Sequence, residues 1–132
     1  MKIQSLPFLF ILLIFSACSK NNKQENCITD LTIGETTTPS VSTVSAGITS
    51  SVKAYGPNLC YSFREVEIKE SSEKAFDIRI KGNVPCYPTV CLDAVYEVNP
   101  TVKIITPSTG IYILRFYNNN NIIFKSDTVV VN

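Results

Sequence analysis

Two long runs of strand-forming residues, separated by four asparagines, constrain the fold of this 132-residue chain more than any other feature. The first run covers residues 110–117 and the second covers residues 122–131. Both are rich in β-branched and aromatic side chains, which favour strands. Asparagine tolerates the left-handed backbone of a tight turn, so residues 118–121 predict the turn of a β-hairpin.

Strand patterns also dominate the residues before this hairpin. Residues 76–81 alternate strictly between apolar and charged side chains, which predicts a strand with one buried face and one solvent face. Further strands are predicted at residues 48–54, 59–69, 90–98 and 102–105. A break in the alternation between Phe63 and Val66 indicates a bulge. Turns are predicted at residues 56–58, 71–72 and 82–83, and a loop or edge segment at residues 36–40.

These patterns predict a single all-β domain over residues 28–132. No stretch of a dozen residues has a convincing helical period, and residues 65–75 come closest to one. About seven or eight short strands, spaced roughly ten residues apart, are typical of an antiparallel β-sandwich. The polar residues 18–27 read as a tether that precedes the domain.

The last two predicted strands resemble those of immunoglobulin-like domains. The resemblance rests on Thr-Pro-Ser-Thr-Gly-Ile-Tyr-Ile-Leu-Arg-Phe at residues 106–116 and on Asp-Thr-Val-Val-Val at residues 127–131. It implies an immunoglobulin-like sandwich in which Tyr112 is a structural tyrosine whose hydroxyl caps the corner at residues 107–110. The chain has no tryptophan, and its last two strands have no cysteine, so the resemblance does not extend to antibody domains.

Residues 1–17 have the order of a secretory signal peptide. Lys2 precedes an apolar run over residues 6–15, which is too short to span a bilayer, and Ser16 and Ala17 lead into Cys18. This pattern resembles the lipobox of bacterial lipoproteins, with Phe15 at a place that usually holds leucine. The resemblance implies that Cys18 is lipidated and becomes the mature N-terminus. The alternative is an ordinary signal peptide that is cut elsewhere.

The whole chain resembles small lipoproteins of Bacteroidetes-type bacteria, in which cysteine-rich immunoglobulin-like domains follow a lipobox. This resemblance implies a cell-envelope protein of the outer membrane, anchored through acyl chains such as palmitate. An acidic run after the lipidated cysteine marks surface export in that group. Residues 19–23 are basic and polar instead, which favours the periplasmic face over the surface.

The chain has five cysteines. Once Cys18 is assigned to lipid, an even set remains, which predicts two disulfides in an oxidising compartment: Cys27, Cys60, Cys86 and Cys91. Three pairings are possible. We favour long-range bridges, with Cys60 joined to Cys86 or Cys91. A metal site is the weaker interpretation, because the spacing lacks a second close pair and the chain has no histidine.

The composition argues against most enzymes. Without histidine, the chain lacks the usual base for Ser-His and Cys-His nucleophiles. No nucleotide-binding motif or nucleic-acid-binding pattern is present. A carboxylate-dependent hydrolase is the least favoured alternative, with seven candidate acids: Glu65, Glu67, Glu70, Glu73, Asp77, Asp93 and Glu97. Glu65 and Glu67 alternate with apolar residues, as charges on a solvent face do. We therefore expect no catalysis and no cofactor.

The remaining expectation is a lipid-anchored protein with a non-catalytic binding or structural role. It would contact a protein or a glycan through loops or a sheet edge. Pro85, Tyr87 and Pro88 form a stiff aromatic segment suited to partner contact. The alternative is an inhibitor of secreted hydrolases or proteases that inserts residues 83–91 into a partner's cleft. Thr128 lies in an Asp-Thr-Val pattern that resembles O-glycosylation sites of Bacteroidetes periplasmic proteins.

Overall fold

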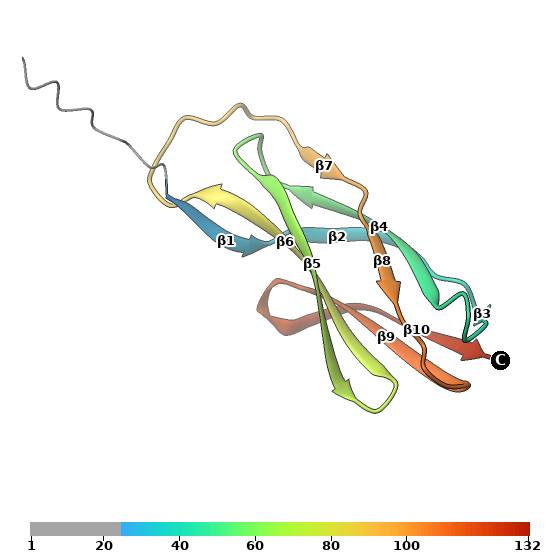
Figure 1. Cartoon of the computed structure of the whole chain (residues 1–132). Coiled ribbons are helices and arrows are strands. Elements are labelled where there is room, and N and C mark those ends of the chain that lie inside the picture. The colour runs from blue at the N-terminus through green and yellow to red at the C-terminus, as the bar shows by residue number, and fades with distance from the viewer. Residues whose placement is uncertain (1–24) are drawn as a thin grey trace, which may run out of the picture.

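The computed structural model of the chain describes residues 25–132, so the expected signal peptide, Cys18 and most of the expected tether lie outside it. The described residues form ten strands and a short 3-10 turn, η1 (Asn119–Asn121) (Figure 1). The strands are β1 (Asn26–Asp30), β2 (Thr32–Thr37), β3 (Val41–Ser42), β4 (Ile48–Gly56), β5 (Ser62–Ser72), β6 (Ala75–Pro85), β7 (Tyr96–Val98), β8 (Thr101–Ile104), β9 (Gly110–Asn118) and β10 (Ile122–Val131). Residues 25–132 hold no helix long and apolar enough to span a membrane.

The strands form two sheets that pack together. The six-stranded sheet holds β1, β3, β5, β6, β9 and β10, and the four-stranded sheet holds β2, β4, β7 and β8. In the six-stranded sheet, β5 pairs with β6 along one edge, while β9 and β1 pair with the two halves of its other edge. Most pairs are antiparallel, but β6 with β9 and β3 with β10 are parallel.

The chain passes from one sheet to the other between β1 and β2. Leu31 lies at this crossing and is fully buried. Its backbone N–H donates to the carbonyl of Ile80 at 2.8 Å. A buried N–H without a partner is costly, so this hydrogen bond allows the backbone to cross the interior.

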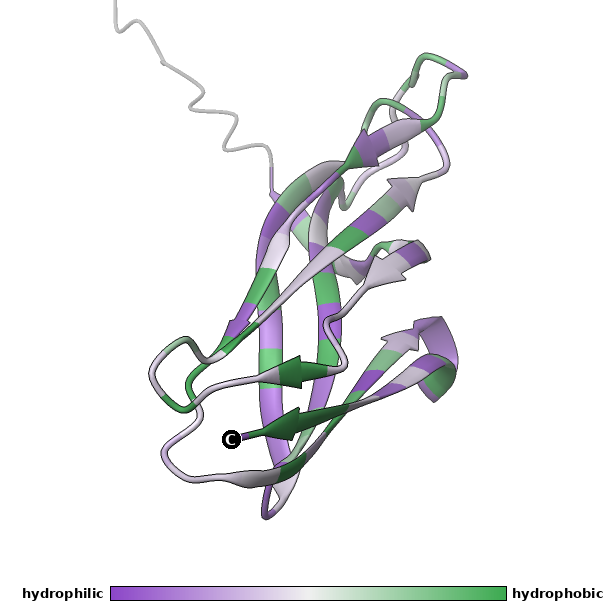
Figure 2. Cartoon of the chain, turned by 90° about the vertical axis from the view of Figure 1, so that its right-hand side faces the viewer, coloured by the Kyte–Doolittle hydropathy of each residue, from purple (hydrophilic) through white to green (hydrophobic). Residues whose placement is uncertain are grey.

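The core lies between the two sheets and follows the alternation of the strands. Tyr112, Leu114 and Phe116 are the buried positions of β9, two residues apart, as a strand with one inward face requires. Figure 2 shows the alternation of hydrophobic and hydrophilic residues along the strands. The other members of the core are Leu31, Ile33, Ile48, Val52, Ala54, Ile78, Ile80, Val102, Ile104, Val129 and Val131.

The all-β sandwich predicted from the sequence is confirmed, with ten strands in place of seven or eight and with two parallel pairs. The predicted bulge is confirmed by a register shift between Phe63 and Glu65. The predicted asparagine turn is also confirmed, because Asn120 and Asn121 have φ values of 61° and 60°. That left-handed backbone suits asparagine.

Three local predictions were wrong. Residues 82–83 are not a turn, because β1 pairs with this part of β6 and extends the strand to Pro85. The turn after β5 lies at residues 73–74, with Lys74 at φ 59°, and not at residues 71–72, which belong to the strand. Within residues 90–98, only Tyr96–Val98 is a strand. The residues before it are held by a disulfide and not by a neighbouring strand.

Candidate functional site

Two disulfides join distant parts of the chain at one end of the sandwich. Cys27 is bonded to Cys86 and Cys60 to Cys91, with Cα–Cα distances of 5.0 and 5.4 Å. Both bridges are long-range, as the sequence analysis favoured, and Cys60 takes one of the two partners expected for it. Because these sulfur atoms are bonded to one another, they are not free to bind a metal. Two disulfides are typical of a secreted, non-cytoplasmic protein.

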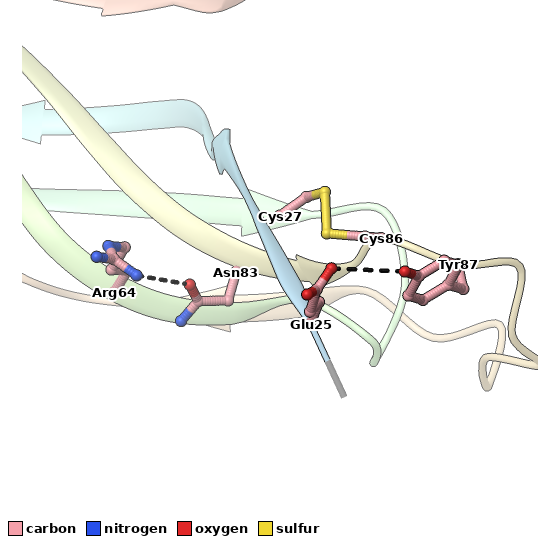
Figure 3. Close-up of a disulfide and its surroundings, with 6 residues drawn as sticks. All are labelled: Glu25, Cys27, Arg64, Asn83, Cys86 and Tyr87. Atoms are coloured by element: carbon pink, nitrogen blue, oxygen red, sulfur yellow. Dashed lines mark hydrogen bonds between the residues drawn. A yellow bond between two sulfur atoms is a disulfide. The ribbon is translucent and has the colours of Figure 1, made fainter. Parts of the chain in front are cut away.

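These bridges fix residues 86–95, which we call the stapled loop. At its start, Cys86 is bonded to Cys27 of β1 (Figure 3), and its N–H donates to the carbonyl of Glu25 at 3.1 Å. Further along, Cys91 is bonded to Cys60, and the N–H of Leu59 donates to the carbonyl of Leu92 at 3.2 Å. The loop has no regular strand, yet it is attached to the sandwich at several points.

The stapled loop exposes large apolar side chains. Val90 is 99% exposed, Leu92 is 73% exposed, and Tyr87 and Val95 are each 65% exposed. The hydroxyl of Tyr87 donates to Oε2 of Glu25 at 3.5 Å (Figure 3). A cluster of exposed apolar residues on a fixed backbone is a feature of interaction sites. The loop is therefore one candidate surface.

The structure places the three expected contact residues differently. Tyr87 and Pro88 are exposed in the stapled loop, whereas Pro85 is the half-buried last residue of β6 and pairs with Asn26. The sequence pattern does not show that Val90, Leu92 and Val95 are exposed in a loop, because their β-branched and aliphatic character is typical of a strand. Their position close to two cysteines was the signal that could have shown a crosslinked loop.

A second candidate surface is the edge of the six-stranded sheet formed by β5. Within residues 25–132, β5 pairs only with β6, so its other edge has no neighbouring strand. Every residue of β5 except Val66 is exposed. Register shifts after Phe63 and after Glu70 leave residues 65–70 as a regular, open edge. An open edge presents unpaired backbone groups that an extended segment of another protein can pair with.

Charged side chains line the outer face beside this edge. Across β5 and β6, Glu65 lies opposite Lys81, Glu67 opposite Arg79, and Lys69 opposite Asp77. A groove of about 770 Å³ crosses the same face, lined by Glu67, Lys69, Asp77, Arg79, Tyr117, Asn121 and Ile123. The open edge therefore adjoins a polar groove with charges of both signs.

The centre of this face is an ion-pair network. Asp30 contacts Lys81 Nζ at 2.5 Å and Arg79 Nη1 at 3.3 Å, while Glu67 lies 3.5 Å from Lys81 Nζ and 3.9 Å from Arg79 Nε. The guanidinium of Arg79 lies 4.8 Å from the ring centroid of Tyr117. Burial lowers the pKa of Lys81, but its hydrogen bond to Asp30 and the charges of Asp30 and Glu67 outweigh burial and raise that pKa.

Five of the seven acids proposed for a hydrolase lie on β5, β6 and β7, whereas Glu73 lies in the turn after β5 and Asp93 lies in the stapled loop. Glu67 belongs to the network, and Asp77 contacts Arg115 Nε at 2.8 Å. Within the described residues, no three histidine, cysteine or acidic side chains are grouped so that they could hold a metal ion. The contacts of Glu67 and Asp77 are those of structural ion pairs, and the absence of catalysis stays a prediction.

Two other residues singled out by the sequence lie in β9 and β10. Tyr112 is buried, and its hydroxyl donates to the carbonyl of Ser108 at 2.8 Å, inside the corner at residues 107–110. This is the contact that the immunoglobulin-like resemblance implies. Thr128 is exposed on β10 opposite Ile113, and its glycosylation stays a prediction. Comparisons of the chain with protein-family models, curated proteins and solved structures found no match.

Proposed function

We propose that the chain is a lipid-anchored, non-catalytic binding protein of the bacterial cell envelope, and that it binds an extended segment of a partner protein along β5. The observation that carries the proposal is the open edge at residues 65–70 beside a charged groove. The lipid anchor is supported by the leader and by Cys18. The two disulfides support an oxidising compartment.

The edge and the groove supply different parts of recognition. Backbone groups of β5 form hydrogen bonds with an added strand whatever its sequence, and the groove beside them selects side chains. Glu65, Glu67 and Lys69 point to one face of β5, because they alternate with Val66 and Ile68. A matching segment has basic side chains opposite the two glutamates and an acidic side chain opposite Lys69, with apolar residues between them.

Affinity capture with chemical crosslinking from envelopes tests this surface. The tagged protein is compared with Lys69→Glu, which reverses one charge at the edge. Lys103→Glu is the matched control, because Lys103 is exposed on β8 of the other sheet. We expect the amount of one crosslinked partner to fall about tenfold with Lys69→Glu, the effect of about 1.4 kcal/mol, and to stay at the wild-type level with Lys103→Glu. Equal recovery from all three proteins would contradict the edge as the binding surface.

The anchor is tested independently of the partner. We expect the native protein to begin at Cys18 and to carry the added mass of acyl chains, and Cys18→Ser to release the protein from membranes. A native N-terminus at another residue, or an unmodified Cys18, contradicts the anchor and leaves the proposal for β5 unaffected.

A further inference from the structure

The described chain begins beside the stapled loop. The carbonyl of Glu25, the first described residue, accepts the hydrogen bond from the N–H of Cys86, and its carboxylate accepts one from Tyr87. The Cys27–Cys86 disulfide holds the same place covalently (Figure 3). An anchor on the N-terminal side of Glu25 is therefore attached at the end of the sandwich that holds the loop.

Little chain separates Cys18 from this end. A fully extended chain spans about 3.5 Å per residue, so residues 18–24 reach about 25 Å at most. The opposite end of the sandwich, which holds the corner at residues 107–110, is much farther away. β6 runs between the two ends with eleven residues, about 36 Å at a strand rise of about 3.3 Å. Acyl chains on Cys18 would therefore keep the stapled end within about 25 Å of the bilayer, whereas the corner can lie up to about 36 Å beyond that end.

The chemistry of the loop suits a lipid surface. Its most exposed large apolar side chains are Val90 and Leu92, and Tyr87 combines an aromatic ring with a hydroxyl. Tyrosine is enriched where membrane and water meet, because its ring and its hydroxyl suit the two sides of that boundary. Asp93 is the one charged residue among residues 86–95. The loop therefore has an apolar surface without the basic residues that anionic lipids attract.

We propose that the stapled loop docks on the bilayer that carries the acyl chains of Cys18. The proposal rests on the lipid anchor of the proposed function. Val90 and Leu92 enter the boundary of the acyl region, and Tyr87 lies among the headgroups. The two disulfides keep the loop in one conformation, so docking needs little ordering. The sandwich then stands on the membrane with its corner end pointing away.

The absence of tryptophan from the chain provides a direct test. Residues 18–132 are coupled through the thiol of Cys18 to a maleimide lipid in phosphatidylcholine and phosphatidylethanolamine vesicles. Val90→Trp reports on the loop, and Ile105→Trp is the matched control, because Ile105 is 87% exposed near the corner. We expect brominated lipid tails to quench Val90→Trp several-fold more than Ile105→Trp, with a blue shift of the Val90→Trp emission alone. Since the contact is apolar, added salt leaves both results unchanged.

A second pair of proteins separates docking from mere proximity. Adding Leu92→Asp to Val90→Trp places a charge on the docking surface, and we expect it to remove most of the quenching. Adding Thr109→Asp, at the corner, leaves the quenching unchanged. All variants are required to melt at the wild-type temperature. Equal and weak quenching of Val90→Trp and Ile105→Trp would overturn loop docking. The vesicle experiment supplies the lipid chemically, so an absence of loop docking can be told apart from an absence of native acylation. The mass of the native N-terminus reports on acylation.

Discussion

The two ends of the sandwich are held together by different kinds of interaction. At the corner end, the buried ring of Tyr112 stacks with that of Phe76 at a centroid distance of 6.4 Å, and its hydroxyl binds Ser108. Lys74 Nζ donates to the carbonyl of Thr109 at 2.9 Å and lies 5.9 Å from the centre of the Tyr112 ring. Packing and hydrogen bonds close this end.

At the stapled end, the core does not extend into the loop. Of residues 86–95, all but Cys91 are exposed, and two disulfides hold the segment. A buried side chain such as Tyr112 fixes the backbone around it, whereas an exposed one such as Val90 does not. The comparison indicates that crosslinks take the place of a core where the side chains face outward, and that this leaves apolar residues free to make contacts.

The largest expected effect on stability comes from removing the disulfides of the stapled end. We expect the double substitution of Cys27→Ser and Cys86→Ser to lower the free energy of unfolding by about 4 kcal/mol, because the bridge spans 59 residues of sequence. The pair Cys60→Ser and Cys91→Ser, with a span of 31 residues, should cost slightly less. Denaturant unfolding measures both.

Hydrogen exchange locates the damage from these substitutions. Amides of the stapled loop should exchange faster in both double variants. The amide of Ile113 donates to the carbonyl of Lys74 at the corner, and it should lose no more protection than the fall in global stability accounts for. A loss below about 1 kcal/mol for either pair, or an equal loss of protection at the two ends, would show that the crosslinks do not replace a core.

A smaller effect is expected from the corner. Tyr112→Phe keeps the buried ring and removes the hydroxyl that binds the carbonyl of Ser108. We expect a loss of about 1 kcal/mol, the usual contribution of one hydrogen bond. Tyr117→Phe is the control for a tyrosine without this contact, and it should change stability by less than about 0.5 kcal/mol. A larger loss of stability for Tyr117→Phe than for Tyr112→Phe would contradict a stabilising role for the corner hydrogen bond.

The hairpin of β9 and β10 and the core strands were predictable from the sequence because their signals are local. The asparagines at residues 118–121 and the alternation of residues 76–81 each depend on neighbouring residues alone. β1 and β2 were not predicted, because the chain changes sheet at Leu31 and a register shift between Ile33 and Glu35 breaks the alternation. Neither event has a local signal in hydrophobicity.

The candidate surfaces were predictable only in part. The charges of Glu65 and Glu67 were expected on a solvent face, but a strand pattern does not show that the strand lies at the edge of its sheet. The cysteines indicated two bridges, but their pairing depends on which strands meet in space. The exposure of Val90 and Leu92 was hidden for the same reason, since an aliphatic run predicts burial until its neighbours are known.

The smallest effect concerns the ion-pair network between the two ends. The pKa of Lys81 is raised above its ordinary value of 10.5, because Asp30 and Glu67 favour the charged amine more than burial disfavours it. The charged amine therefore contributes stability below about pH 10.5, and this contribution disappears as the pH rises through the higher pKa of the folded state. We expect the wild-type protein to lose more stability than Lys81→Met between neutral pH and the far alkaline range. Denaturant unfolding of both proteins at each pH measures this difference. Identical pH profiles would mean that Asp30 and Glu67 do not stabilise the charged amine in the folded protein.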